Sequence, residues 1–185
     1  GYFSVGMGKI YHNTFPDPKS WSITEPKPTG YATYSKATLA VLERRNEELK
    51  RQGKTQQQIA NGYRGPATEM EDVPDNQRFD GALGDMALEH LRQVSRRKEP
   101  FFLAVGFIRP HLPWTPPKKY WDFYDPAKLT LAPNQFLPKN APSMAMWGMY
   151  ELRAYMDFAD TKESPVLLTE EQQRALSDAD AHLAL

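Results

Sequence analysis

Residues 100–113 read PFFLAVGFIRPHLP, an apolar run that ends in a basic, proline-rich turn. Every position from Phe101 to Phe107 is apolar or glycine, without the alternation that marks a strand with one face in water. Such a run predicts a strand that is buried on both faces of a parallel sheet. A strand of this kind needs neighbours and covering helices, so the run also predicts the fold class of the chain around it.

A helix is predicted directly before this strand, over residues 80–97, with Asp80 placed to cap its first turn. Apolar residues recur on one face of the helix at Leu83, Ala87, Leu91 and Val94. A helix followed by a buried strand is the second half of a βαβ unit. Residues 2–7 are short and β-prone, and they would supply the first strand. We therefore expect an α/β fold with a mostly parallel sheet flanked by helices and long proline-rich loops.

The rest of the sequence predicts two further helices between irregular segments. Residues 36–51 are rich in helix-forming side chains and are followed by Gly53 as a stop signal. Residues 170–176 follow a capping-box pattern and form the other predicted helix. Residues 56–74 are polar and broken by prolines, which predicts a loop. The first of these helices has three leucines available for one face, Leu39, Leu42 and Leu49.

Composition excludes several classes of protein. The chain has 185 residues, with 23 basic and 23 acidic side chains, so it is formally neutral. Neutrality argues against a nucleic-acid binder or a polybasic membrane module, because both need an excess of Lys and Arg. The chain has no cysteine, hence no disulfide, thiolate metal site or cysteine nucleophile. Its longest apolar run, residues 101–108, is far shorter than the ~18–20 residues of a membrane span, and no signal-peptide pattern follows Gly1.

Proline is the residue type in excess, with 16 in the chain, of which nine lie between Pro100 and Pro142. The same stretch carries a cluster of aromatic residues from Trp114 to Tyr124, too much apolar material for a disordered tail. We expect a long, irregular surface segment, of the kind that often carries function. Trp114 is our candidate for stacking on a sugar ring, and the alternative is that the aromatic cluster only anchors a long loop.

The ends of the two predicted strands carry residues suited to catalysis. Lys9 and His12 follow the first strand, and Arg109 and His111 follow the second. In an open α/β sheet, ligands bind beyond the carboxyl ends of the strands. Two imidazoles and two cations at one sheet edge suit an anionic substrate, because histidine transfers protons near neutral pH and Lys or Arg stabilises oxyanion charge. The alternative is that both histidines only hydrogen-bond loop carbonyls, and the pattern leaves both interpretations open.

The motifs GKIYH at residues 8–12 and PFFLAVGFIRPHLP at residues 100–113 together resemble the sulfatase family, in particular its iduronate-2-sulfatase-like branch. The segments DVPD at 72–75, PKKY at 117–120 and LTLAP at 129–133 resemble that branch in the same order, and the resemblance covers residues 1–176. It implies an alkaline-phosphatase-like fold and the hydrolysis of sulfate esters of sugars or glycans. It also implies a secreted, periplasmic or lysosomal protein whose partner is a sulfated sugar or glycan, with neither nucleic acid nor a membrane span.

The resemblance implies roles for individual side chains. Lys9 would bind the sulfate oxygens. His12 would contact a formylglycine nucleophile and help to break down the sulfated intermediate. His111 would contact the sulfate and help to protonate the leaving alcohol. Arg109 would contact a uronate carboxylate on the substrate.

The family's nucleophile and metal lead to a further expectation about this stretch of chain. Sulfatases make formylglycine from the first residue of a Cys/Ser-x-Pro-x-Arg motif and bind calcium beside it, whereas this sequence contains no such motif. We assign no metal ligand within it and expect the calcium ligands to lie outside it. We therefore expect residues 1–185 to be an incomplete portion of a single sulfatase catalytic domain, with an atypical end at 177–185, and to be inactive in isolation.

Two other functions stay open at this point. The first is a phosphodiester or phosphonate hydrolase of the alkaline phosphatase superfamily, which would keep the fold and change the chemistry. The second is a module without catalysis that binds an anionic glycan through the aromatic segment.

Overall fold

The structure is a computed structural model, and it describes residues 1–12, 15–62, 64–131, 133, 136, 139–142, 144, 151–159, 169–171 and 173–174. The chain divides into two compact units. The first unit consists of residues 1–33 and 73–111, and the second of residues 34–72 and 112–185. The atypical end predicted at 177–185 lies outside the described residues. The helix predicted at 170–176 lies partly outside them, and its described residues are helical.

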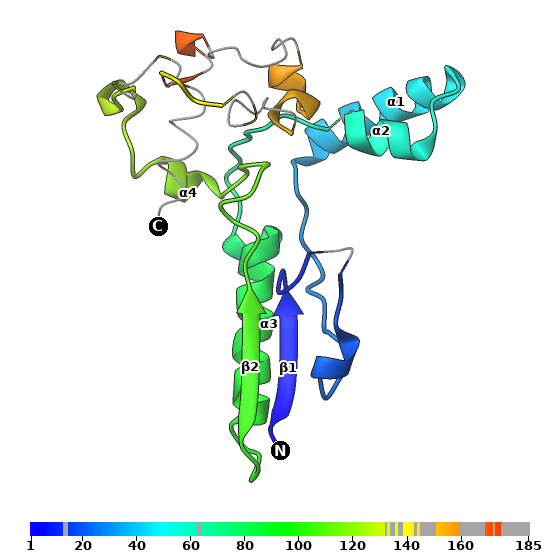
Figure 1. The fold of residues 1–185 in the computed structure, drawn as a ribbon, viewed down its shortest axis with the longest axis vertical. Coiled ribbons are helices and arrows are strands. Elements are labelled where there is room, and N and C mark those ends of the chain that lie inside the picture. Colours follow the sequence, from blue (N-terminus) through cyan, green and yellow to red (C-terminus); the bar gives the residue numbers. More distant parts are fainter. Residues whose placement is uncertain are drawn as a thin grey trace. The chain divides into compact units, whose positions relative to one another are not determined.

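The first unit is built on two parallel strands, β1 (Phe3–Gly8) and β2 (Phe101–Gly106). Their register pairs Gly8 with Gly106, so the two carboxyl ends lie side by side (Figure 1). Helix α3 (Phe79–Val94) contacts both strands. The core between helix and strands contains four buried side chains, Val5, Met7, Leu83 and Val94. The predicted α/β class, with a helix joining two parallel strands, is confirmed.

The prediction that β2 is buried on both faces is wrong. Phe102 is 56 % exposed, although its neighbours Leu103 and Val105 pack against the core beside α3. On the face away from α3, the indole of Trp21 stacks on the ring of Phe102, with centroids 6.4 Å apart and planes 3° from parallel. Within the described residues, β2 pairs with β1 alone. One indole covers only part of this face, and so the strand keeps a solvent-facing side.

The apolar stripe predicted on α3 is also partly wrong. Leu83 and Val94 are buried as expected, whereas Leu91 is 42 % exposed. At about 100° per residue, Leu91 lies about 80° around the helix from Leu83, while Val94 lies about 20° from it. The rest of the core face of the helix is supplied by Phe79, Met86 and Ala87, which are partly buried and pack against the same core. Spacing by fours therefore drifts off the buried face, because the helix repeats at 3.6 residues per turn.

In the second unit, α1 (Lys36–Arg51) has the bounds that the sequence predicts. The Oγ of Ser35 accepts a hydrogen bond from the amide of Thr38 at 3.2 Å and caps the helix. Gly53 follows the last turn with a φ of 80°, a left-handed conformation that favours glycine. The predicted leucine face is buried only near its end, because Leu49 is 8 % exposed whereas Leu39 is 41 % exposed.

Residues 56–62 are predicted as part of a polar loop, and this prediction is wrong, since they form helix α2 (Gln56–Gly62). A reciprocal capping box begins the helix: the amide of Gln58 donates to Thr55 Oγ1 at 3.2 Å, and the amide of Thr55 donates to Gln58 Oε1 at 2.9 Å. Ile59 is 6 % exposed and is the large apolar residue of the segment. A single buried side chain gives no apolar periodicity, which is why the pattern fails to indicate a helix.

The remainder of the second unit is mostly irregular over its described residues, apart from α4 (Lys118–Trp121), short 3-10 turns and the helical residues 170–171 and 173–174. Residues 64–71 run beside residues 114–118, since the amide of Trp114 donates to the carbonyl of Ala67 at 2.7 Å and the amide of Glu69 donates to the carbonyl of Trp114 at 3.1 Å. A small core gathers around Ala67, Leu152, Tyr155 and Phe158. The predicted proline-rich, aromatic segment is mainly irregular over its described residues, but Trp114, Thr115 and Pro117 are buried and not at the surface as predicted.

Short 3-10 turns complete both units, at Pro18–Ser20, Asp75–Gln77, Pro126–Lys128, Leu152–Ala154 and Met156–Phe158. Among the described residues, no helix has both the length and the apolar character needed to cross a membrane.

Glu69 holds the first turn of α1 and provides a test of this unit. Its carboxylate accepts hydrogen bonds from the Ser35 amide at 2.7 Å, from the Ser35 hydroxyl at 2.9 Å and from the Thr38 hydroxyl. Glu69→Ala removes all three hydrogen bonds and should lower the free energy of unfolding by about 1–3 kcal/mol, measured by urea denaturation. Glu43→Ala, at an exposed position on the same helix, should change it by less than about 0.5 kcal/mol. Equal unfolding midpoints for the two variants would contradict this role.

Candidate functional site

The carboxyl ends of β1 and β2 form one edge of the sheet, and the two predicted catalytic segments begin there. The amide of Lys9 donates a hydrogen bond to the carbonyl of Gly106 at 2.7 Å. The approach is so close that a Cβ on Gly106 would lie 2.2 Å from the Lys9 carbonyl oxygen. Gly8 has a φ of 76°, which turns the chain away at the end of β1. Register and glycines together thus start the two segments next to each other.

The segment after β1 carries Lys9 and His12, and both side chains are exposed. A tight turn follows the strand, in which the amide of Ile10 donates to the carbonyl of Gly8 at 3.2 Å. The imidazole of His12 lies tilted against the ring of Phe15, with centroids 6.5 Å apart. Lys9 has no hydrogen-bond or ion-pair partner among the described side chains, which leaves its charge available to a ligand.

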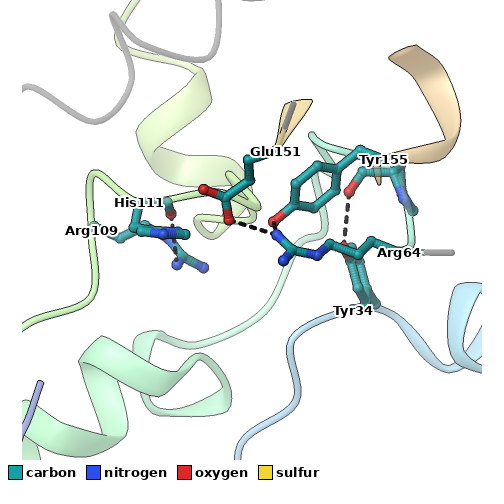
Figure 2. Close-up of polar contacts among 7 residues, drawn as sticks. Tyr34, Arg64, Arg109, His111, Glu151 and Tyr155 are labelled. Carbon is teal, nitrogen blue, oxygen red and sulfur yellow. Dashed lines mark hydrogen bonds and ion pairs between the residues drawn. The ribbon is translucent and has the colours of Figure 1, made fainter. Parts of the chain in front are cut away.

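The segment after β2 carries Arg109 and His111 and is held by the carboxylate of Asp80. One oxygen of Asp80 accepts from the amide of Ile108 at 2.8 Å, and the other accepts from the amide of Arg109 at 2.9 Å. A turn follows, in which the amide of His111 donates to the carbonyl of Ile108 at 3.0 Å. Figure 2 shows the guanidinium of Arg109 turned back to the carbonyl oxygen of His111, at 3.3 Å. The peptide bond before Pro110 is cis.

The predicted capping role of Asp80 is wrong. The residue before the first turn of α3 is Arg78, which makes no side-chain cap, and Asp80 itself lies inside that turn. Both carboxylate oxygens bind the segment after β2 instead. The sequence analysis missed this contact, because an aspartate in the first turn of a helix has the same local pattern whether it caps the helix or binds a distant segment.

Trp114, the predicted sugar-stacking residue, belongs to the second unit. Its side chain is 8 % exposed, and its main chain bonds to Ala67 and Glu69. A side chain with so little exposed surface leaves little area on which a sugar ring could stack. Contact with substrate at Trp114 stays a prediction.

The arrangement at the sheet edge combines an exposed ammonium group, two exposed imidazoles and a half-buried guanidinium, contributed by Lys9, His12, His111 and Arg109. Such a set can pair with an anionic group and exchange protons with it near neutral pH. The geometry supports binding of an anionic ester, and the individual roles of these side chains stay predictions.

Comparison with known proteins finds sulfatases that are similar to this chain. Human iduronate 2-sulfatase is 26% identical over 173 residues, which cover 85% of this chain and 27% of that protein. The mouse iduronate 2-sulfatase is 27% identical over 163 residues, with the same shares covered. A sulfatase of Formosa agariphila is 30% identical over 136 residues, covering 73% of this chain and 25% of that protein. This chain is related to the sulfatases.

The match to these sulfatases covers only part of each of them. The chain spans about a quarter of the length of the curated sulfatases that it matches. No family model matches it. The expectation that residues 1–185 form one portion of a single catalytic domain stays a prediction.

The cofactors that the sulfatase resemblance implies do not fit the residues described. No three His, Asp or Glu side chains in the described ranges come together in a way that could hold a metal ion. Both carboxylate oxygens of Asp80 accept hydrogen bonds from the backbone amides that follow β2. The sequence also lacks a Cys/Ser-x-Pro-x-Arg motif for formylglycine. We therefore assign neither calcium ligands nor a nucleophile to the described residues.

A small cavity of about 130 Å³ lies beside the end of β1, lined by Gly8, Glu25, Pro26, Lys27, Pro28, Tyr31 and Phe79. The indole N–H of Trp21 holds Glu25 at 2.8 Å, and the rings of Tyr31 and Phe79 meet edge to face. Ligand pockets usually measure about 300–1,000 Å³. The cavity is too small to enclose a sugar ring.

The second unit carries a polar cluster around Arg64 (Figure 2). Its guanidinium donates to Glu151 Oε1 at 2.6 Å and to the hydroxyl of Tyr155 at 3.3 Å. Burial lowers the pKa of Arg64, but the hydrogen bonds to Glu151 and Tyr155 outweigh burial and raise that pKa above its ordinary value. Arginine is charged at any physiological pH in either case. The cluster joins residues 64 and 151–155 and has the character of a structural ion pair.

Proposed function

We propose that the protein that carries this sequence hydrolyses sulfate esters of sugars or glycans, on an alkaline-phosphatase-like fold. One observation carries the proposal: the Lys-x-x-His and Arg-Pro-His segments leave neighbouring strands at one sheet edge, joined by the 2.7 Å hydrogen bond from Lys9 to Gly106. The relationship to sulfatases supports the choice of a sulfate ester among anionic esters.

The two cations of this edge have separate tasks in the proposal. Lys9 binds the sulfate oxygens, where negative charge grows as the ester bond breaks. Its side chain is exposed and unpaired in the described structure, so no internal salt bridge has to break first. Arg109 contacts a second acidic group of the substrate, such as the carboxylate of a uronic acid.

The two imidazoles transfer protons. In sulfate ester hydrolysis the bond between sulfur and the ester oxygen breaks, an oxygen from water ends on sulfur, and the released alcohol takes up a proton. His111 donates that proton to the leaving oxygen, and His12 assists on the side of the attacking nucleophile. Contact of a sugar with Trp114, expected from the sequence, stays a separate prediction, because Trp114 belongs to the second unit and is 8 % exposed. By the same resemblance, we place the protein outside the cytosol, as a secreted, periplasmic or lysosomal enzyme.

The test is sulfate release by the protein expressed at the length that its gene encodes. It should hydrolyse para-nitrophenyl sulfate and a sulfated uronic acid disaccharide, with sulfate measured by ion chromatography. The 185-residue chain alone should release none, because it lacks the nucleophile motif. Para-nitrophenyl phosphate and bis(para-nitrophenyl) phosphate serve as matched substrates with the same leaving group.

Each outcome separates the candidate functions. Faster cleavage of the phosphate diester than of the sulfate would replace the proposal by a phosphodiester or phosphonate hydrolase. Glycan binding without any ester cleavage would replace it by a binding module. Cleavage of the sulfate esters alone supports it.

A further inference from the structure

We infer that Asp80 is a positioning residue that fixes the direction in which His111 leaves the sheet. This inference rests on the proposed function for its catalytic part. Its structural part stands on contacts within the first unit, and the two parts are tested separately.

The contact between Asp80 and the segment after β2 is bidentate. Each carboxylate oxygen accepts from one of two successive amides, Ile108 at 2.8 Å and Arg109 at 2.9 Å. Hydrogen bonds from amides to a carboxylate are roughly twice as strong as those between neutral groups. Two such bonds to neighbouring residues fix the orientation of the chain as well as its position.

A chain of hydrogen bonds continues from the held amides to His111. The carbonyl of Ile108 accepts from the amide of His111 at 3.0 Å, which closes a turn. The guanidinium of Arg109 returns to the His111 carbonyl oxygen at 3.3 Å. The main chain of His111 is therefore bonded to the same two residues that Asp80 holds. A shift of the carboxylate would move both ends of this turn together.

The first turn of α3 is itself a fixed support for Asp80. Gly81 packs so closely on the preceding turn that a Cβ there would lie 2.0 Å from the carbonyl oxygen of Asp75. Arg78, 5 % exposed, donates its backbone amide to the same Asp75 carbonyl at 2.9 Å. The carboxylate thus projects from a rigid helix start, as a residue that orients a catalytic group should.

The test compares Asp80→Asn with Asp85→Asn, which removes a carboxylate from an exposed position of the same helix. In Asp80→Asn, one acceptor oxygen becomes an NH₂ group that faces a backbone donor. We expect faster hydrogen exchange at the amides of Ile108 and Arg109, with unchanged exchange at Leu103 and Val105 in β2. Unchanged exchange at all four amides would overturn the inference. Asp85→Asn should leave all four amides as in the unchanged protein.

The catalytic arm uses the gene-length protein and sulfate release. Asp80→Asn should lower kcat by about 10- to 100-fold, because a displacement of about 1 Å at a reacting group has this effect. For a sulfated sugar without a carboxylate, the KM should change by less than about 3-fold, since Lys9 on the other strand still binds the sulfate and Arg109 has no acidic group to contact. Asp80→Glu keeps the charge and should recover part of kcat. If Asp80 had a purely structural role, Asp80→Asn would instead lower the amount of folded enzyme and leave kcat per folded molecule unchanged. Asp80→Glu would then restore the yield of folded enzyme.

The two arms distinguish failure of the inference from failure of the proposed function. Faster exchange with unchanged kcat in an active enzyme would overturn the catalytic part. If the unchanged protein cleaves no sulfate ester, the proposed function fails, and the exchange arm still decides whether Asp80 holds this turn.

Discussion

His111→Ala should lower kcat for hydrolysis of a sulfated sugar by about 10²- to 10⁴-fold, the usual contribution of a general acid. The imidazole is exposed in the segment that follows β2, and in the proposed function it donates the proton that the leaving alcohol takes up. A sugar alkoxide is a poor leaving group and needs the proton. The loss should therefore be much smaller for para-nitrophenyl sulfate, whose leaving phenolate is stable without protonation.

A matched histidine provides the control for this experiment. His90 lies on α3, ten residues beyond Asp80, or about 15 Å along the helix at 1.5 Å per residue. His90→Ala should change kcat by less than about 2-fold, as expected for a side chain remote from the reaction. An equal loss for the sugar sulfate and for the aryl sulfate in His111→Ala would refute a proton-donating role. A loss confined to KM would show that His111 only binds substrate.

Gly106→Ala should lower the free energy of unfolding by about 2–4 kcal/mol, as overpacking against backbone does. The new Cβ would lie 2.2 Å from the Lys9 carbonyl oxygen and 2.4 Å from its carbonyl carbon. Both atoms belong to the backbone, so no side-chain rotation can relieve the overlap. The strand ends must separate, and this would also break the 2.7 Å hydrogen bond from Lys9 to Gly106.

A second glycine gives a control of opposite sign. Gly84 lies within α3, and a Cβ built on it meets no atom within 4 Å. Gly84→Ala should therefore raise stability by about 0.5–1 kcal/mol, because alanine favours a helix over glycine. Guanidinium unfolding of both variants against the unchanged protein measures the difference. Similar midpoints for the two alanine variants would contradict the close approach at the sheet edge.

The features that could be predicted from the sequence are those determined by neighbouring residues. The bounds of α1 follow from its helix-forming side chains and from Gly53 as stop, which lies two residues beyond the helix. The two parallel strands follow from the β-prone residues 2–7 and the apolar run at 101–107, because an apolar strand of this kind needs a neighbouring strand to pair with. Placement of the two histidine segments at one edge then follows from parallel pairing alone.

The features that could not be predicted depend on distant residues. The partners of Asp80 lie 28 and 29 positions further along the chain, and a first-turn aspartate predicts a cap equally well. The exposure of Phe102 depends on how much Trp21 covers, which no local pattern contains. Helix α2 depends on a capping box at Thr55 and Gln58 in a segment with little apolar signal.

The register of β1 against β2 has a consequence for how this site can vary between proteins. The start of each predicted catalytic segment is set by one backbone hydrogen bond and two glycines at the strand ends. The number of residues that connect the strands does not enter this geometry. Residues 34–72 belong to the other unit, so insertions or deletions there should leave the spacing of the two motifs in space unchanged. Related chains whose loops differ greatly in length can therefore share the same arrangement of the two motifs at the strand ends.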